Sequence, residues 1–258
     1  MLKITNLAAI FPVLFMAACG GAPSPPPTPD PPVALDEFPS FERPRSAGPL
    51  GIDLSIDASD VLNELKASQI DFVARYYRDP VSALPALSAA EAQRLSSLGV
   101  KIVAVWEPSS PDQRYLNYSD GYRDAGMAYG QAKAIGQPPG SANYFAIDLN
   151  TKRLDAVEQY FRGVAAGLAA AGGGVSEYKV GVYGSGAVCD AVKGAGLAQY
   201  SWLSNSASWA GSLGYDGWNI KQGDPLDGLS FDNDSDEARG EYGGFRLRRY
   251  DIAAPRGL

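Results

Sequence analysis

The feature that most constrains the fold is an alternation of short apolar runs with amphipathic stretches from residue 49 onward. Several runs are almost continuously apolar, among them IDFVARYY (70–77), KIVAVW (101–106) and YFAIDL (144–149). Runs of this kind are typical of strands that are buried on both faces of a parallel sheet. The amphipathic stretches between them indicate helices. The chain is therefore expected to form an α/β fold.

Eight strands are expected, most of them followed by a helix. The strands are predicted at residues 51–54, 70–77, 101–106, 144–149, 178–183, 200–203, 218–221 and 229–231. Helices are predicted at residues 59–68, from a capping box at 88–91 to about 99, and at 121–135 and 154–171. Such an alternation over residues 49–258 predicts a compact (β/α)₈ barrel. An open doubly wound sheet is the alternative, which the lack of a G-x-G-x-x-G after the first strand disfavours.

The first 48 residues are expected to lie outside this barrel. Residues 1–18 have the features of an export signal, because Lys3 precedes an apolar run that is too short to span a bilayer. The sequence Met16-Ala17-Ala18-Cys19 resembles a bacterial lipobox, which implies lipidation of Cys19. Residues 19–48 are rich in proline and predict an extended linker. We expect an exported lipoprotein anchored to a membrane of the bacterial cell envelope, in the outer membrane or facing the periplasm if the cell is Gram-negative; an ordinary cleaved secretory signal is the alternative.

The chain contains no histidine and has a formal net charge of −7. Ser-His-Asp catalysis, Cys-His catalysis and histidine-ligated zinc are therefore excluded. Acid–base chemistry falls to carboxylates, tyrosines, lysines or Cys189, which we expect to be a buried structural residue. The acidic balance argues against a nucleic-acid partner, and no cofactor or metal site is expected.

Four acidic residues stand at or just after predicted strand ends. Asp53 follows the first strand, Glu107 the third, Asp148 the fourth and Asp232 the eighth. In a (β/α)₈ barrel the functional residues lie at the C-terminal ends of the strands, so these acids are expected to meet at one mouth. Neighbouring carboxylates raise the pKa of at least one of them, which keeps it protonated enough to act as an acid. The four residues are therefore predicted as catalytic groups for glycoside chemistry.

Other polar and aromatic residues near strand ends are predicted to contact substrate. Tyr183 and Gln222 are expected to orient it, and Arg75 to pair with one of the acids. Tyr76, Trp106, Trp209 and Trp218 are further candidates for stacking on sugar rings. The predicted substrate-binding set is Arg75, Tyr77, Asn150, Tyr183, Trp202 and Gln222.

Several segments resemble a known family. They are GIDLS (51–55), FVARYY (72–77), LSAAEAQRLSSLGVKIVAVWE (87–107), YFAIDLN (144–150) and GVYGSGAVC (181–189). Together with DGWNIKQ (216–222) and FDND (231–234), they resemble the bacterial glycoside-hydrolase-like domains once catalogued as a domain of unknown function. Those domains are similar in turn to the family 25 lysozymes, small (β/α)₈ barrels that cut peptidoglycan. The resemblance covers roughly residues 50–236.

The resemblance also implies roles for single residues. Asp53 and Asp232 match the first-strand and last-strand aspartates of the lysozymes. The lysozymes carry Asp-x-Glu after the fourth strand, with the glutamate as proton donor, whereas this chain has Asp148-Leu149-Asn150. Asn150 has no titratable proton, so Glu107 or Asp148 would have to donate instead. We expect a barrel that binds and hydrolyses peptidoglycan or a related glycan, with a catalytically silent glycan-binding module and a structural envelope protein as alternatives.

Overall fold

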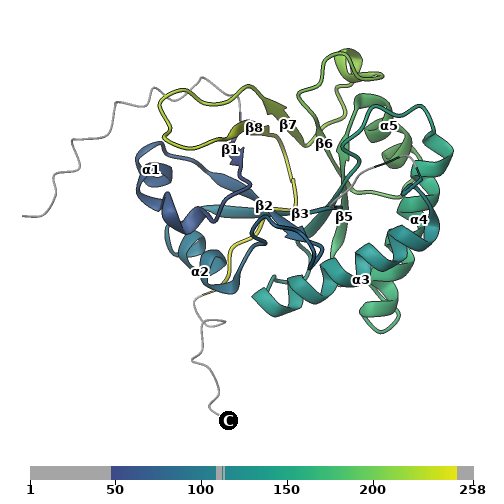
Figure 1. Cartoon of the computed structure of the whole chain (residues 1–258), viewed down its shortest axis with the longest axis horizontal. Helices are drawn as coiled ribbons and strands as arrows, with labels where there is room; N and C mark the ends of the chain where they lie inside the picture. The colour runs from purple at the N-terminus through teal and green to yellow at the C-terminus, as the bar shows by residue number, and fades with distance from the viewer. Residues whose placement is uncertain (1–47, 109–111, 113, 249–258) are drawn as a thin grey trace, which may run out of the picture. The chain divides into compact units, whose positions relative to one another are not determined.

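The computed structural model of the chain describes residues 48–108, 112 and 114–248. Eight strands close into a barrel in the order of the chain (Figure 1). They are β1 (Leu50–Asp53), β2 (Phe72–Arg78), β3 (Lys101–Glu107), β4 (Ala142–Ala146), β5 (Lys179–Gly184), β6 (Tyr200–Leu203), β7 (Ile220–Gly223) and β8 (Asp234–Ala238). Strands β1 to β7 pair in parallel, and β8 is antiparallel to both of its neighbours, β7 and β1. The predicted α/β barrel is confirmed.

One α-helix follows each of the first five strands. The helices are α1 (Leu62–Ala67, preceded by the 3₁₀ helix η2, Ala58–Asp60), α2 (Ala89–Ser97), α3 (Tyr118–Ile135), α4 (Leu154–Ala171) and α5 (Gly186–Gly194). After β6 and β7, the described residues form loops and the 3₁₀ helix η3 (Ser212–Gly214). The βα repeat therefore holds for five units, and loops cover the closing strands (Figure 1).

Local sequence signals explain where the helices begin and end. The predicted capping box is present: Ser88 Oγ accepts a hydrogen bond from the Glu91 N–H, and the Glu91 carboxylate accepts one from the Ser88 N–H. Asn117 caps α3 in the same way by accepting from the Asp120 N–H. Gly136 ends α3 with a φ of 78°, a left-handed conformation that favours glycine.

The alternation of side chains along each strand gives the molecule two cores. Phe72, Tyr144 and Trp202 are among the residues that fill the inside of the barrel. Outward-facing residues such as Phe145 pack against the helices. Cys189 on α5 is fully buried with the second group, which confirms its predicted burial. Because these side chains fill the inside of the barrel, a site lined by polar residues has room only at the end of the barrel, which we call its mouth.

The last strand differs from the prediction. Residues 229–231 form part of a loop, and β8 lies at Asp234–Ala238. Because β8 is antiparallel, its first residue stands at the mouth, where Asp234 pairs with Asp53 at the end of β1. The sequence of β8, DSDEA, has no apolar run that would mark a strand.

The predicted signal peptide (1–18), Cys19 and all of the predicted linker (19–48) except Gly48 lie outside the described residues. Within the described part of the chain, no helix has the length and apolar character needed to cross a membrane.

Candidate active site

Side chains from all eight strand ends line a cavity of about 250 Å³, which we call the mouth cavity. Its lining residues are Asp53, Tyr76, Val105, Glu107, Ala146, Asp148, Tyr183, Trp202, Gln222 and Asp234. Inward-facing residues at the C-terminal ends of β1 to β7 supply most of them, and β8 supplies Asp234 from its N-terminal end. Seven residues predicted from sequence therefore meet here: Asp53, Tyr76, Glu107, Asp148, Tyr183, Trp202 and Gln222.

Asp53 is the most buried acid of the mouth cavity, with 7% of its surface exposed. Tyr76 Oη donates to Asp53 Oδ1 over 3.0 Å, and Gln222 Nε2 donates to Asp53 Oδ2 over 2.8 Å. Gln222 Oε1 accepts from Tyr183 Oη over 3.0 Å, which fixes the orientation of the amide. Burial raises the pKa of Asp53 to about 6; the nearby charge of Asp234 adds to this effect, while the two hydrogen bonds oppose it.

Glu107 is held by an ion pair. Arg78 Nη1 donates to Glu107 Oε2 over 2.9 Å, and the guanidinium carbon lies 4.2 Å from the centre of the Tyr76 ring. Burial raises the pKa of Glu107, the charge of Asp148 raises it further, and Arg78 opposes both. Arg78 was not among the predicted site residues. It shares the inward face of β2 with Tyr76, two residues away, and this spacing is the signal that could have identified it.

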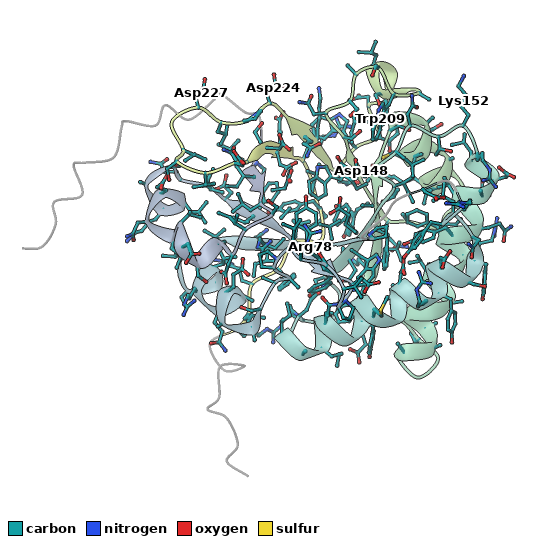
Figure 2. The ribbon with its side chains drawn as sticks, viewed as in Figure 1. Arg78, Asp148, Lys152, Trp209, Asp224 and Asp227 are labelled. Carbon is teal, nitrogen blue, oxygen red and sulfur yellow. The ribbon has the colours of Figure 1, made fainter. Side chains whose placement is uncertain are left out.

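Asp148 lies beyond the end of β4, near the centre of the view in Figure 2. Asp148 is exposed at the surface of the mouth, and partial desolvation of its carboxyl group raises its pKa. Among the described residues, no hydrogen bond to its carboxyl group is found. The Asp148 carboxyl group thus has no partner among the described residues, whereas both oxygens of Asp53 already accept hydrogen bonds.

Two acids of β8 were not predicted as site residues. Asp234 lines the mouth cavity, and burial raises its pKa. Asp236 is fully buried inside the barrel, where desolvation raises its pKa strongly. The spacing Asp232-x-Asp234-x-Asp236 places alternate residues on one face of an extended strand. This spacing is the sequence signal that could have identified Asp234 and Asp236. No group of acids arranged to hold a metal ion is found in the described part of the chain.

Four residues of the predicted catalytic and substrate-binding sets do not reach the mouth cavity, and neither do the stacking candidates Trp106, Trp209 and Trp218. Asp232 is exposed on the loop before β8. Arg75 and Tyr77 face outward from β2, because the alternation on this strand points Tyr76 inward. Arg75 pairs with the fully buried Glu91 of α2 instead of a mouth acid. The Tyr77 hydroxyl donates to Gln137 Oε1 over 2.6 Å behind the sheet.

Asn150 is the fourth of these residues. Its side chain is exposed, and its Oδ1 accepts a hydrogen bond of 3.3 Å from the backbone N–H of Ala210. This contact joins the loop after β4 to the loop between β6 and β7. Asn150 thus connects two loops and does not line the cavity.

A second cavity of about 550 Å³, which we call the outer cavity, adjoins the first. Its lining residues are Asp53, Ser55, Tyr76, Pro225, Leu226, Asp227, Gly228, Leu229, Phe231, Asp232, Asn233 and Asp234. Asp53, Tyr76 and Asp234 line both cavities. The two cavities therefore form one cleft, covered on one side by the loop between β7 and β8.

This barrel with a carboxylate-lined mouth defines a glycoside-hydrolase-like domain. Residues 63–245 match the sequence model of the Rv2525c-like, glycoside hydrolase-like domain. The match covers well over half of the chain, so the chain belongs to this family. The resemblance noted in the sequence is thereby confirmed.

Solved structures show the same fold. The Mycobacterium tuberculosis Tat-secreted protein Rv2525c, in complex with L-tartrate, superposes with a TM-score of 0.59 at 23% identity, over 77% of this chain and 99% of that one. The modular autolysin LytC from Streptococcus pneumoniae superposes with a TM-score of 0.50 at 14% identity, over 74% of this chain and 46% of LytC.

Two curated relatives come from Bacillus subtilis (strain 168), and both are uncharacterized proteins. FadG is 29% identical over 163 residues, and YbfG is 29% identical over 123 residues. The matches span 61% and 45% of this chain but only 28% of FadG and 17% of YbfG.

Proposed function

We propose that the chain binds a glycan in the mouth cavity and hydrolyses a glycosidic bond there. The observation that carries this proposal is the convergence of Asp53, Glu107, Asp148 and Asp234, from four different strand ends, on one cavity. Glycoside hydrolysis needs two carboxyl groups on either side of the scissile bond, one of them protonated. The raised pKa values of these acids suit that requirement.

The contacts of each acid suggest its role. Asp148, free of hydrogen bonds within the described residues and with a raised pKa, donates its proton to the leaving oxygen as the C–O bond breaks. Glu107, held beside Arg78, takes a proton from the water whose oxygen bonds to the anomeric carbon. Asp53, oriented by Tyr76 and Gln222, stabilises the positive charge that develops on the sugar ring. The net reaction consumes one water for each bond broken.

A non-hydrolytic glycan-binding module is the second candidate, and Asn150 is the observation that favours it. The proton-donating glutamate of the lysozyme pattern is replaced by an amide that bonds to Ala210. Under the first proposal, Asn150→Glu leaves hydrolysis unchanged, because Asp148 already donates the proton. A large gain of hydrolysis in Asn150→Glu would support the second candidate.

A purely structural role fits the contacts less well. Such a role would leave the mouth acids neutralised by arginines. Among the described residues, only Glu107 of the four mouth acids forms an ion pair with an arginine.

We further propose that the protein is an exported lipoprotein whose glycan is peptidoglycan or a related wall polysaccharide. The support is the export-signal and lipobox pattern of residues 1–19 and the fold shared with an autolysin. β1 begins at Leu50, at the end of the barrel opposite the mouth.

The test is the release of reducing ends from purified peptidoglycan by the purified full-length chain. We expect release by the wild type and a loss of about 100-fold or more in Asp148→Asn. Asp190→Asn, on the exposed side of α5, is the matched control and should keep full activity. Saturable binding without release would favour the second candidate, and neither binding nor release would contradict both.

A further inference from the structure

We infer that the cleft formed by the mouth and outer cavities prefers the units of a wall glycan that have lost the N-acetyl group, and so carry a free, protonated amine, over N-acetylated or acidic units. This inference rests on the proposed function and specifies its substrate class. It is carried by the charge of the cleft, by the free carboxylates of one fixed loop, and by the apolar surface beside them.

All the aspartate, glutamate, lysine and arginine side chains that line the cleft are acidic ones. Six acids line it: Asp53, Glu107, Asp148, Asp227, Asp232 and Asp234. No lysine or arginine is among the described residues that line either cavity. Arg78, which lies over the ring of Tyr76 beside the mouth, is already paired with Glu107. A concave site lined by one sign of charge concentrates counter-ions, so it attracts an ammonium group and repels a carboxylate.

Besides Asp148, two of these acids have carboxylates without a partner among the described residues. Asp227 and Asp232 are exposed on the loop between β7 and β8, and no hydrogen bond or ion pair to either side chain is found within the described residues. Asp224 on the same loop differs, because it accepts a hydrogen bond of 2.8 Å from Asn205 Nδ2. Figure 2 shows Asp224 and Asp227 on this loop at the edge of the barrel.

The loop that carries the free acids is fixed in place. The Leu226 N–H donates to Asn233 Oδ1 over 2.9 Å, which closes the loop on itself. The Ser230 N–H donates to the Glu64 carboxylate of α1 over 2.8 Å. The acids are thus held in position before a ligand arrives, which lowers the entropic cost of binding.

The outer cavity also offers apolar surface next to these acids. Leu226, Leu229 and Phe231 line it together with Asp227 and Asp232. A hexosamine with a free amine has the matching character, with C–H groups on its ring faces and one positive charge. A bare metal ion does not match, because no group of acids arranged to hold one is found among the described residues.

The test compares two β-1,4-linked tetrasaccharides, one of glucosamine and one of N-acetylglucosamine, by calorimetric titration of the full-length chain at about pH 6.5. We expect the glucosamine tetrasaccharide to bind about 10-fold tighter or more. Its affinity should fall about 10-fold as NaCl rises from about 0.05 to 0.5 M, because salt screens charge attraction at exposed groups.

Two double variants with the same change in net charge locate the effect. Asp227→Asn/Asp232→Asn should bring the two affinities within about 3-fold of each other. Asp190→Asn/Glu241→Gln changes two exposed acids outside the cleft and should keep the wild-type preference. A preference that survives in the first double variant would overturn the inference.

The remaining outcomes separate the inference from the proposed function. Equal or tighter binding of the N-acetylated tetrasaccharide by the wild type would overturn the inference and leave the glycan site standing. Binding of neither sugar, together with no binding of peptidoglycan, would overturn the proposed function and the inference with it.

Discussion

Arg78 Nη1 lies 2.9 Å from Glu107 Oε2, and this ion pair joins the ends of β2 and β3 at the mouth of the barrel. The Arg78 side chain is almost fully buried, and that of Glu107 is 25% exposed. The pair is therefore only partly screened by water. It fixes the position of one of the two carboxyl groups to which we assign proton transfer.

Replacing Arg78 by methionine tests this relationship. Arg78→Met removes the positive charge, so we expect the pKa of Glu107 to rise further above its usual value. The uncompensated carboxylate should also lower the free energy of unfolding at about pH 8, by about 1–3 kcal/mol. Carboxyl NMR titration and urea unfolding measure the two effects. Arg78→Lys keeps the charge and should show smaller changes; equal changes in both variants would contradict an electrostatic role.

The raised pKa values of the mouth acids predict that the chain becomes less stable as the pH rises. The pKa of Asp53 is about 6 in the folded chain and about 3.9 in an unfolded one, so between these values the folded state binds more protons. The free energy of unfolding should then fall as the pH rises from about 4 to 7, by up to about 3 kcal/mol from Asp53 alone. Raised pKa values at Glu107, Asp148, Asp234 and Asp236 act in the same direction.

Urea unfolding at about pH 5 and pH 8 measures this dependence. The chain has no histidine that would titrate in the same range. Asp53→Asn should reduce the difference between the two pH values, whatever its effect on stability at either one. Stability that increases from pH 5 to pH 8 would show that the acids are not buried as described.

The sequence predicted the parts of the site that follow apolar runs. The strands before Asp53, Glu107 and Asp148 are buried on both faces and stand out as hydrophobic segments, so the polar residue at each end was visible. The same double burial hid the direction of the side chains. On β2 both faces are apolar, and sequence alone did not show that Tyr76 and Arg78 point inward while Arg75 and Tyr77 point outward.

The closing strand could not be found from hydrophobicity. β8 contains three acids in five residues, and it runs opposite to the other strands. Asp236 is buried inside the barrel although an aspartate is rarely an interior residue. Its place depends on the closure of the barrel, which is a long-range property. For this reason the predicted last-strand acid was Asp232, whereas Asp234 reaches the mouth cavity.

Glu91 should be important for stability. It is fully buried, pairs with Arg75, and accepts a hydrogen bond of 2.9 Å from the Ala58 N–H. Glu91→Gln leaves the buried guanidinium without a counter-charge, which should cost about 3–5 kcal/mol of unfolding free energy. The control is Glu158→Gln on α4, whose pair with Arg162 is exposed and should contribute less than about 0.5 kcal/mol. Similar losses in the two variants would contradict the assignment of a buried pair.

The close packing of α3 against α4 depends on a glycine. A Cβ atom at Gly163 would lie 2.1 Å from the backbone oxygen of Tyr118, so Gly163→Ala must push the helices apart. We expect a loss of about 1–3 kcal/mol in thermal or urea unfolding. Gly126→Ala on α3 is the matched control, because a Cβ there meets no atom within 4 Å. It should stabilise the chain by about 0.5–1 kcal/mol, since alanine is the better helix former.

The central claim is that the mouth cavity is a glycan site, and a crystal structure of Asp148→Asn soaked with an oligosaccharide that the chain binds tests it most directly. We predict a sugar ring in the mouth cavity, with hydroxyl groups within about 3 Å of Asp53, Glu107 or Tyr183. A sugar bound only elsewhere on the barrel, with the mouth cavity free of it, would contradict the account.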